Sequence, residues 1–195
     1  MSDTIRTFVA VETSEAVRRL AEELIEKLRA AKANVKWVER HNMHLTLKFL
    51  GDVPAGEIPQ VCEAVQKAVA AAQPVELHLR GAGAFPRAAR PSTVWLGVAA
   101  GEEELAAVQR DVERALAKLG YPKEGRRFEP HLTLGRVRDS GPAVAELGRL
   151  LKQHADFDAG PFTVSEAVVF SSQLTPKGPI YEALSRASLT GPRSE

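Results

Sequence analysis

The sequence has a single cysteine, Cys62, among its 195 residues. One cysteine excludes a disulfide framework within the chain, and it excludes a zinc site built from several cysteines. A chain of this length buries roughly 70% of the surface that its unfolded form exposes, so it folds without such cross-links. Cys62 falls on the apolar face of a predicted helix, where we interpret it as a small core residue.

Long apolar runs are also missing. No stretch approaches the ~18 uninterrupted apolar residues that a membrane-spanning helix requires. The first apolar run, residues 8–11, lies between Arg6 and Glu12 and is far shorter than the core of a signal peptide. We therefore expect a cytoplasmic protein without a membrane segment.

The chain has no excess of charge of either sign. Lys and Arg number 26 against 25 Asp and Glu, which gives a net charge of +1. This balance argues against a protein that coats long nucleic acids by charge alone, but it allows a small basic site for a terminal phosphate. Gly81-Ala82-Gly83 and Gly97 complete neither of the glycine-rich nucleotide-binding fingerprints. We expect no cofactor.

The hydrophobic period alternates between two and 3.6 along the chain, which predicts interspersed strands and helices. Strands are predicted over residues 5–11, 35–38, 44–50, 75–79, 93–98, 131–137, 162–170 and 180–189. Helices are predicted from a cap at Ser14 to residue 28 and over residues 58–69, 102–119 and 141–155. Short turns join several strand pairs, so the pattern favours an α+β fold with antiparallel-rich sheets. Residues 1–195 are expected to form a single domain, with a frayed tail over 190–195.

Two identical tetrapeptides, His44-Leu45-Thr46-Leu47 and His131-Leu132-Thr133-Leu134, begin 87 residues apart, each in a predicted strand. Residues i and i+2 of a strand point to the same face. Each strand therefore presents a histidine and a threonine on one face and leucines on the other. If the two strands face each other, two imidazoles and two hydroxyls meet in one cleft.

These four groups suit the cleavage of a strained phosphodiester. One neutral histidine would take a proton from water and one protonated histidine would give a proton to the leaving oxygen, since the pKa of histidine is ordinarily about 6.5. Threonine hydroxyls can donate to the phosphate oxygens on which charge develops. Such a pair needs no metal. A scaffold role and a two-histidine metal site are the alternatives, and the latter has no third ligand at a recognisable spacing.

The flanking sequence strengthens this interpretation. Segments 42–51 and 128–137 resemble the paired His-x-Thr-x blocks of the bacterial and archaeal RNA 2′,3′-cyclic phosphodiesterases. This family is also known as the 2′-5′ RNA ligases, within the two-histidine phosphoesterase superfamily. Segments 6–10 and 174–181 resemble the family too, so the similarity extends from about residue 5 to residue 184.

The resemblance implies a bilobal fold in which two antiparallel sheets, each with helices outside, surround a central cleft. It implies metal-independent hydrolysis of RNA 2′,3′-cyclic phosphate ends to 2′-phosphates, without a cofactor. The implied partner is RNA with such an end, with tRNA fragments among the candidates. No obligate protein partner is implied, and we expect a monomer.

The resemblance also implies roles for site residues. The first histidine of the family, here His44, protonates the departing 3′ oxygen, and the second, here His131, activates water. The motif threonines, here Thr46 and Thr133, hold the phosphate. An arginine five residues after the second histidine is associated with phosphate binding and corresponds to Arg136.

Strand geometry adds one candidate and one condition. Lys48 lies four residues after His44, so in a regular strand it faces the cleft, where it could bind phosphate; a solvated cation at the strand end is the alternative. Arg136 lies five residues after His131 and would point away from the cleft in a regular strand. Gly135 can mark a bulge that shifts the alternation by one residue and turns Arg136 to the cleft, which is the interpretation we favour; without such a bulge, Arg136 is a surface charge.

Further residues could contact the RNA. Phe8 and Trp37 are candidates for stacking on bases, with placement in the core as the favoured alternative. Six arginines could together form a basic rim for the RNA backbone, although each one alone is predicted to lie on a solvated face: Arg80, Arg87, Arg90, Arg126, Arg127 and Arg138. His41, His78 and His154 have no paired partner and receive no role.

Other reactions and a binding role fit the same site. The cleft could join RNA ends through 2′-5′ bonds in the reverse direction, or act on small cyclic phosphates or 2′-5′ oligonucleotides. A non-catalytic module that binds RNA ends is the alternative from a different class. Hydrolysis is favoured in water because it releases the strain of the cyclic phosphate.

Overall fold

The computed structural model describes residues 3–138 and 140–192. Strands and helices alternate along the chain and build two antiparallel sheets, of four and five strands. The predicted α+β fold is confirmed. Within the described ranges, no helix has the length and apolar character needed to cross a membrane.

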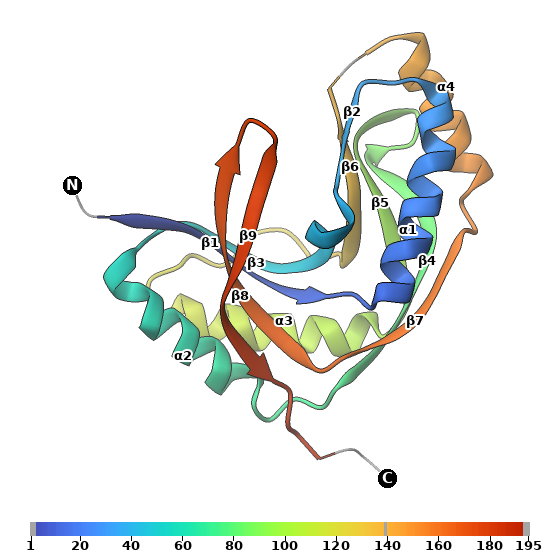
Figure 1. Cartoon of the computed structure of the whole chain (residues 1–195). Coiled ribbons are helices and arrows are strands. Elements are labelled where there is room, and N and C mark those ends of the chain that lie inside the picture. Colours follow the sequence, from blue (N-terminus) through green and yellow to red (C-terminus); the bar gives the residue numbers. More distant parts are fainter. Residues whose placement is uncertain (1–2, 139, 193–195) are drawn as a thin grey trace.

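The four-stranded sheet contains the first motif strand. Its order is β3-β1-β8-β9, with β1 (Thr4–Glu12), β3 (His44–Pro54), β8 (Glu166–Thr175) and β9 (Gly178–Ser188). Two helices that pack on each other cover this sheet, α2 (Ile58–Val69) and α3 (Glu102–Ala117). They lie below the sheet in Figure 1.

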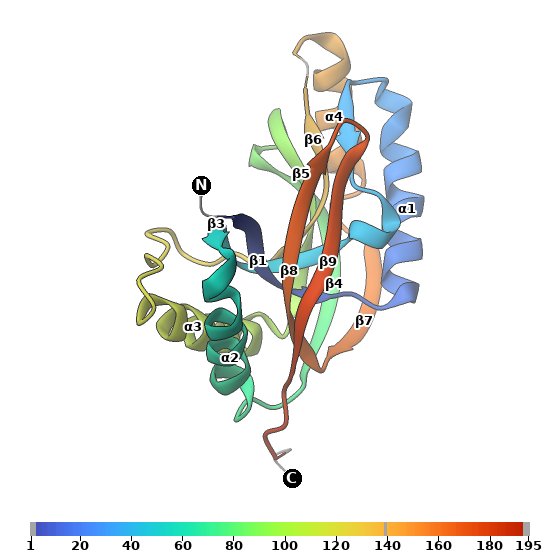
Figure 2. The same cartoon turned by 60° about the vertical axis from the view of Figure 1, so that its left-hand side comes forward.

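The five-stranded sheet contains the second motif strand. Its order is β2-β6-β5-β4-β7, with β2 (Val35–Trp37), β4 (Val75–Arg87), β5 (Arg90–Ala100), β6 (His131–Val137) and β7 (Asp158–Val164). It is covered by α1 (Glu15–Leu28) and α4 (Pro142–Gln153). Figure 2 shows α1 on the opposite side of the molecule from α2 and α3.

Two helices cover the sheet to which the strand before them does not belong. The helix α1 follows β1 of the four-stranded sheet but packs against the five-stranded one, and α3 follows β5 but packs beside β3. Short 3₁₀ helices complete the connections: η1 (Arg29–Ala31), η2 (Arg40–Asn42) and η3 (Ala55–Glu57). Each sheet is therefore covered by one helix that follows a strand of the other sheet.

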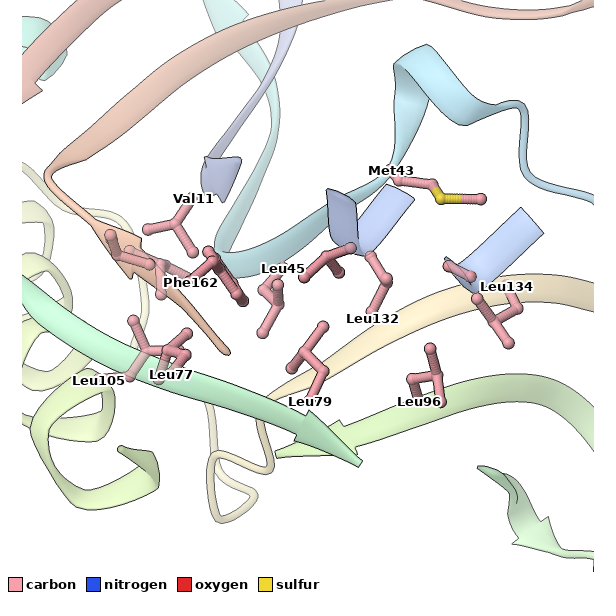
Figure 3. Close-up of a cluster of buried hydrophobic side chains, with 14 of the residues drawn as sticks. Val11, Met43, Leu45, Leu77, Leu79, Leu96, Leu105, Leu132, Leu134 and Phe162 are labelled. Atoms are coloured by element: carbon pink, nitrogen blue, oxygen red, sulfur yellow. The ribbon is translucent and has the colours of Figure 1, made fainter. Parts of the chain in front are cut away.

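The motif leucines lie in the core between the sheets. Leu45, Leu132 and Leu134 are fully buried, and Leu47 nearly so. Figure 3 shows Leu45 and Leu132 side by side in the cluster that also holds Leu79 of β4. The predicted division of each motif strand into a leucine face and a histidine–threonine face is confirmed.

Three strand predictions were wrong. The predicted strands 75–79 and 93–98 were too short, because both continue toward each other and form the long β4–β5 hairpin. Gly83 in this hairpin is needed for packing, since a Cβ atom on it would lie 2.2 Å from the Trp95 ring. The predicted strand 162–170 is divided at Ser165 into β7 and β8, which belong to different sheets. The extended apolar pattern continues through the crossing, so the sequence pattern does not mark the break.

Two further predictions concern the helix cap at Ser14 and the tail that begins at residue 190. The Ser14 cap is confirmed, because its Oγ accepts a hydrogen bond from the Val17 amide at 3.2 Å. At the start of the expected tail, Thr190 Oγ1 donates to the Ala70 carbonyl and the Gly191 amide donates to the Ala72 carbonyl, each at 2.8 Å. Residues 193–195 of that tail lie outside the described residues.

Candidate active site

The two motif histidines are held in the same way. Nδ1 of His44 lies 2.7 Å from the carbonyl oxygen of Asn42, and Nδ1 of His131 lies 2.7 Å from that of Glu129. A carbonyl oxygen only accepts, so each Nδ1 carries a proton and donates it. Each neutral ring therefore has the lone pair on Nε2, the nitrogen available for proton transfer.

His44 lies in an aromatic enclosure. Its ring centroid is 4.9 Å from that of Phe8, 5.4 Å from that of Tyr181 and 6.4 Å from that of Phe170. Burial lowers the pKa of His44; the Asn42 carbonyl and Glu12 oppose this shift, and Arg18 adds to it. The free protein therefore holds His44 as a neutral ring at neutral pH, and its protonated form is a stronger acid than an exposed imidazolium.

His131 shares a strand face with Thr133. The strand β6 is regular here, since His131 pairs with Gly97 and Thr133 pairs with Trp95 in successive register. Phe85 packs edge-on against the His131 ring, with centroids 5.0 Å apart, and Phe85 in turn contacts Trp95 at 5.3 Å. Aromatic side chains thus support both histidines.

A cavity of about 370 Å³ lies between the two sheets. In Figure 1 its elements are the β8–β9 hairpin on one side and β2 and β6 on the other, with β3 passing below. His44, Thr46 and Thr133 line it. His131 is not among the lining residues, but it lies on the same strand face as Thr133. The structure therefore brings both motif threonines and the first histidine to one cavity, with the second histidine beside it.

The first motif also has a contact within itself. Nε2 of His44 lies 3.1 Å from Oγ1 of Thr46. The hydroxyl can donate to the neutral ring nitrogen or accept from the protonated one. Nε2 of His44, the atom available for proton transfer, therefore lies next to the Thr46 hydroxyl that is predicted to bind phosphate.

The predicted bulge near Gly135 is confirmed. Thr133 pairs with Trp95 and Gly135 pairs with Val94, so Leu134 is an extra residue in the ladder. The alternation shifts by one residue, and Arg136 lines the cavity. Its Nη1 lies 3.5 Å from Thr93 Oγ1.

An equivalent bulge in β3 overturns the prediction for Lys48. Thr46 pairs with Ala10 and Lys48 pairs with Val9, so Leu47 is the extra residue. Lys48 therefore turns inward, with only 3% of the residue exposed, and its Nζ lies 2.5 Å from Oε1 of Glu113. The prediction that Lys48 faces the cleft was wrong because it assumed a regular strand, and we no longer regard Lys48 as a phosphate ligand.

Phe49 takes the place at the cavity that Lys48 leaves. Phe49 lines the cavity with 45% of its surface exposed, and the Arg6 guanidinium lies 4.7 Å from its ring centroid. Sequence reasoning missed both residues. One signal in the sequence could have identified Phe49. Because the two tetrapeptides are identical, a bulge predicted for the second motif could equally be predicted for the first, and it would turn Phe49 to the cavity.

Positive charge gathers at the cavity. Of the residues that the structure describes, five cations line it, against the single carboxylate of Glu39: Arg6, Lys36, Arg136, Arg138 and Lys177. Among residues 3–138 and 140–192, none of these five forms an ion pair. Unpaired cations around a concave surface attract a polyanion.

The wider RNA-contact candidates separate into two groups. Trp37 and, from the suggested basic rim, Arg138 line the cavity. Phe8 also lines it but is only 4% exposed and packs on His44, in line with the core alternative. Arg126 and Arg127 line a separate cavity beside α3, and Arg80, Arg87 and Arg90 line neither.

The β8–β9 hairpin is tied to the first histidine. Asn42, whose carbonyl holds His44, donates from Nδ2 to the Pro179 carbonyl at 3.0 Å. Burial raises the pKa of Tyr181 on the same hairpin, and the positive charges of Arg136 and Arg6 oppose this shift, so all three side chains face one space. Asn42 and Tyr181 are site residues that the sequence analysis did not identify.

Comparison with known proteins supports a family assignment. Residues 9–175 match the family model described as the 2′-5′ RNA ligase superfamily. The RNA 2′,3′-cyclic phosphodiesterase of Methanothermobacter thermautotrophicus is 38% identical over 91% of this chain and 95% of its own length. The protein of the same name from Aquifex aeolicus is 34% identical over 96% of this chain and 98% of its own.

Solved structures have the same fold. The structure of a Thermus thermophilus protein, TT0787, has a TM-score of 0.81 and 28% identity, covering 97% of this chain and 100% of that one. The apo form of E. coli LigT has a TM-score of 0.74 and 24% identity, covering 97% and 99%. By its match to the family model and its identity to these relatives over nearly their whole length, the chain belongs to the 2′-5′ RNA ligase superfamily.

Proposed function

We propose that this protein hydrolyses the 2′,3′-cyclic phosphate at the end of an RNA to a 2′-phosphomonoester. The observation that carries the proposal is that a main-chain carbonyl holds Nδ1 of each motif histidine, which leaves Nε2 of each ring for proton transfer, beside a cationic cavity lined by both motif threonines. The printed names of the full-length relatives support the same activity.

In this proposal the cyclic phosphate binds between the two motif strands. Thr46 and Thr133 donate hydrogen bonds to its non-bridging oxygens, and Arg136 supplies positive charge. These donors stand in place before the reaction, so they stabilise the charge that develops as water attacks.

The two histidines transfer the protons. Nε2 of His131 takes a proton from water as the water oxygen forms a bond to phosphorus. The bond from phosphorus to the 3′ oxygen breaks, and protonated His44 gives its Nε2 proton to that oxygen, which leaves a 2′-phosphate and a 3′-hydroxyl. The step ends with His131 protonated and His44 neutral, and exchange with solvent restores the starting state.

The lowered pKa of His44 fits the donor role. A stronger acid protonates an alkoxide leaving group more readily. The negative charge of the bound phosphodiester favours the protonated ring, so binding raises the pKa of His44 and charges it when the substrate is present.

Two features support RNA over a small cyclic phosphate as the substrate. The cations of the cavity extend beyond Arg136 to Lys36 and Arg138, which suits a chain with several phosphates. The exposed ring of Phe49 offers a stacking surface for a base next to the reacting end.

Product analysis tests the proposal. Purified protein is incubated, with and without EDTA, with an oligoribonucleotide that ends in a 2′,3′-cyclic phosphate. We expect a 2′-phosphate end in both cases and a loss of several orders of magnitude in turnover for His44→Ala and for His131→Ala. Abolition by EDTA or a 3′-phosphate product would contradict the mechanism, and RNA binding without turnover would favour the binding-module alternative. A 5′-hydroxyl RNA in the same mixture reports the reverse, joining reaction.

A further inference from the structure

A buried polar cluster lies beside the first motif strand and has no part in the mechanism above. Lys48, Gln109 and Glu113 are three of the six buried polar or charged residues in the described part of the chain. They lie where β3 packs on α3. A buried charge pair costs solvation free energy that an apolar pair of similar size does not, so its presence calls for a reason other than stability.

The contacts of this cluster extend to a third segment. Nζ of Lys48 contacts Oε1 of Glu113 and also donates to the carbonyl oxygen of Pro122. Both oxygens of Glu113 accept from the amide of Glu124, at 3.2 and 3.3 Å. Lys48 therefore binds a main-chain carbonyl, and Glu113 binds a main-chain amide, of the same short segment, residues 122–124.

That stretch leads to the second histidine. Residues 118–130 form neither helix nor strand and connect α3 to β6. The carbonyl of Glu129 in this stretch holds Nδ1 of His131. Its path has few regular hydrogen bonds of its own, so side chains must fix it.

The cluster thus links the two halves of the site. Lys48 is four residues after His44 on β3, and it turns toward Glu113 because of the bulge at Leu47. Gln109 on the preceding turn of α3 lies 3.5 Å from the Leu47 carbonyl at the bulge itself. The bulge, the ion pair and the stretch ahead of His131 form one connected set of contacts.

We propose that Lys48 and Glu113 are positioning residues for His131. They fix the path of residues 122–124, so that the Glu129 carbonyl meets Nδ1 of His131 and Nε2 is directed to the phosphate site. The pair is ionic because apolar side chains can bind neither the Pro122 carbonyl nor the Glu124 amide. This inference rests on the role proposed above for His131.

A double variant, Lys48→Met with Glu113→Leu, separates positioning from stability. Replacing both partners leaves no unpaired charge in the core. In ¹⁵N-labelled protein without ligand, we expect the ring nitrogen resonances of His131 to move toward a tautomer average, while those of His44 stay unchanged. With a cyclic-phosphate oligoribonucleotide, we expect kcat to fall by about 10- to 100-fold, the scale of a displacement near 1 Å, with KM nearly constant.

A matched control distinguishes general destabilisation. Val65→Ala truncates a fully buried side chain of α2 that makes none of these contacts. It should lower the melting temperature and leave kcat and the His131 resonances as in the wild type. If Val65→Ala changes them as the double variant does, the positioning role is wrong.

The remaining outcomes are also decisive. If the double variant folds with wild-type His131 resonances and wild-type kcat, the proposal is overturned. If it fails to fold, Glu113→Gln, which keeps one acceptor oxygen, is measured instead, and an unchanged His131 ring and kcat there overturn the proposal equally. An inactive wild-type protein would refute the proposed function, whereas the His131 spectrum would still report on the positioning.

Discussion

Phe49 and Arg136 occupy equivalent positions on the two motif strands, and both line the same cavity. Each is five residues after a histidine, and each follows a bulge at the second leucine of its tetrapeptide. The two strands therefore repeat in backbone geometry as well as in sequence. One copy places an aromatic face at the cavity and the other a guanidinium, so a nucleotide meets a surface for its base and a charge for its phosphate.

Removing the Phe49 ring should weaken RNA binding more than catalysis. Loss of a stacked base costs about 1–3 kcal/mol, so Phe49→Ala should raise KM for an oligoribonucleotide about tenfold, with little change in kcat. Steady-state kinetics on an oligoribonucleotide measure this effect. Phe49→Trp, which keeps a stacking face, should stay near the wild type, and equal KM values for the alanine and tryptophan variants would contradict the role.

The pKa of His44 should be low in the free protein and should rise with phosphate. Burial holds the pKa of His44 below 6.5, and a bound phosphate anion counteracts that shift. An NMR titration of the His44 ring, with and without inorganic phosphate, measures both values. A pKa of His44 that is not below 6.5 in the free protein and does not rise with phosphate would be evidence against the donor mechanism.

The same shift has a consequence for folding. A histidine whose folded pKa is depressed contributes stability that is complete above its unfolded value of about 6.5 and is lost as pH falls toward the folded value. Urea unfolding at pH 5 to 8 should therefore show a steeper loss of stability below pH 6.5 for the wild type than for His44→Gln. Parallel curves for the two proteins would show that His44 does not couple folding to pH.

The Lys48–Glu113 pair should behave as a coupled unit in stability. Removing one partner of a buried ion pair costs about 3–5 kcal/mol, so Lys48→Met alone should destabilise strongly. Adding Glu113→Leu should recover much of this loss, because no unpaired charge remains. Urea denaturation of the two single variants and the double variant gives the coupling free energy, and additive losses would show that the pair is not coupled.

Gly83 should tolerate no side chain because of Trp95. A Cβ atom on Gly83 would lie 2.2 to 2.7 Å from three atoms of the indole ring, so Gly83→Ala must displace it, at a cost of about 1–3 kcal/mol. Trp95 pairs with Thr133 on β6, so activity should fall along with stability. Gly56→Ala, where nothing lies within 4 Å, serves as the control, and equal unfolding midpoints for the two variants would contradict the expectation.

The sequence predicted those features that follow from local rules. The bounds of β6 and the bulge before Arg136 were predicted, because the hydrophobic alternation and Gly135 both mark them. The bulge of β3 has no glycine, since Leu47 and Lys48 occupy it, and it shows only in the pairing with β1. The inward turn of Lys48 was therefore not predictable from its position in the strand.

Features that depend on distant segments were not predictable. Arg6, Lys36 and Lys177 come from three separate elements and become neighbours of one cavity only through the folded chain. The division at Ser165 depends on which sheet each half of an extended segment joins, and both halves have the same apolar alternation. Composition and hydrophobic period describe one segment at a time, whereas the meeting of side chains from distant segments depends on the topology of the whole fold.

The exchange of α1 and α3 between the sheets makes the two halves of the chain interdependent. A chain nicked between α2 and β4 would give an N-terminal piece that has α1 without most of the sheet it covers, and β1 and β3 without α3. Neither piece would hold a complete hydrophobic interior, so they would be stable only after complementing each other. The spacing of the two imidazoles is accordingly set when the interleaved interior closes, and no flexible joint is needed to bring them together.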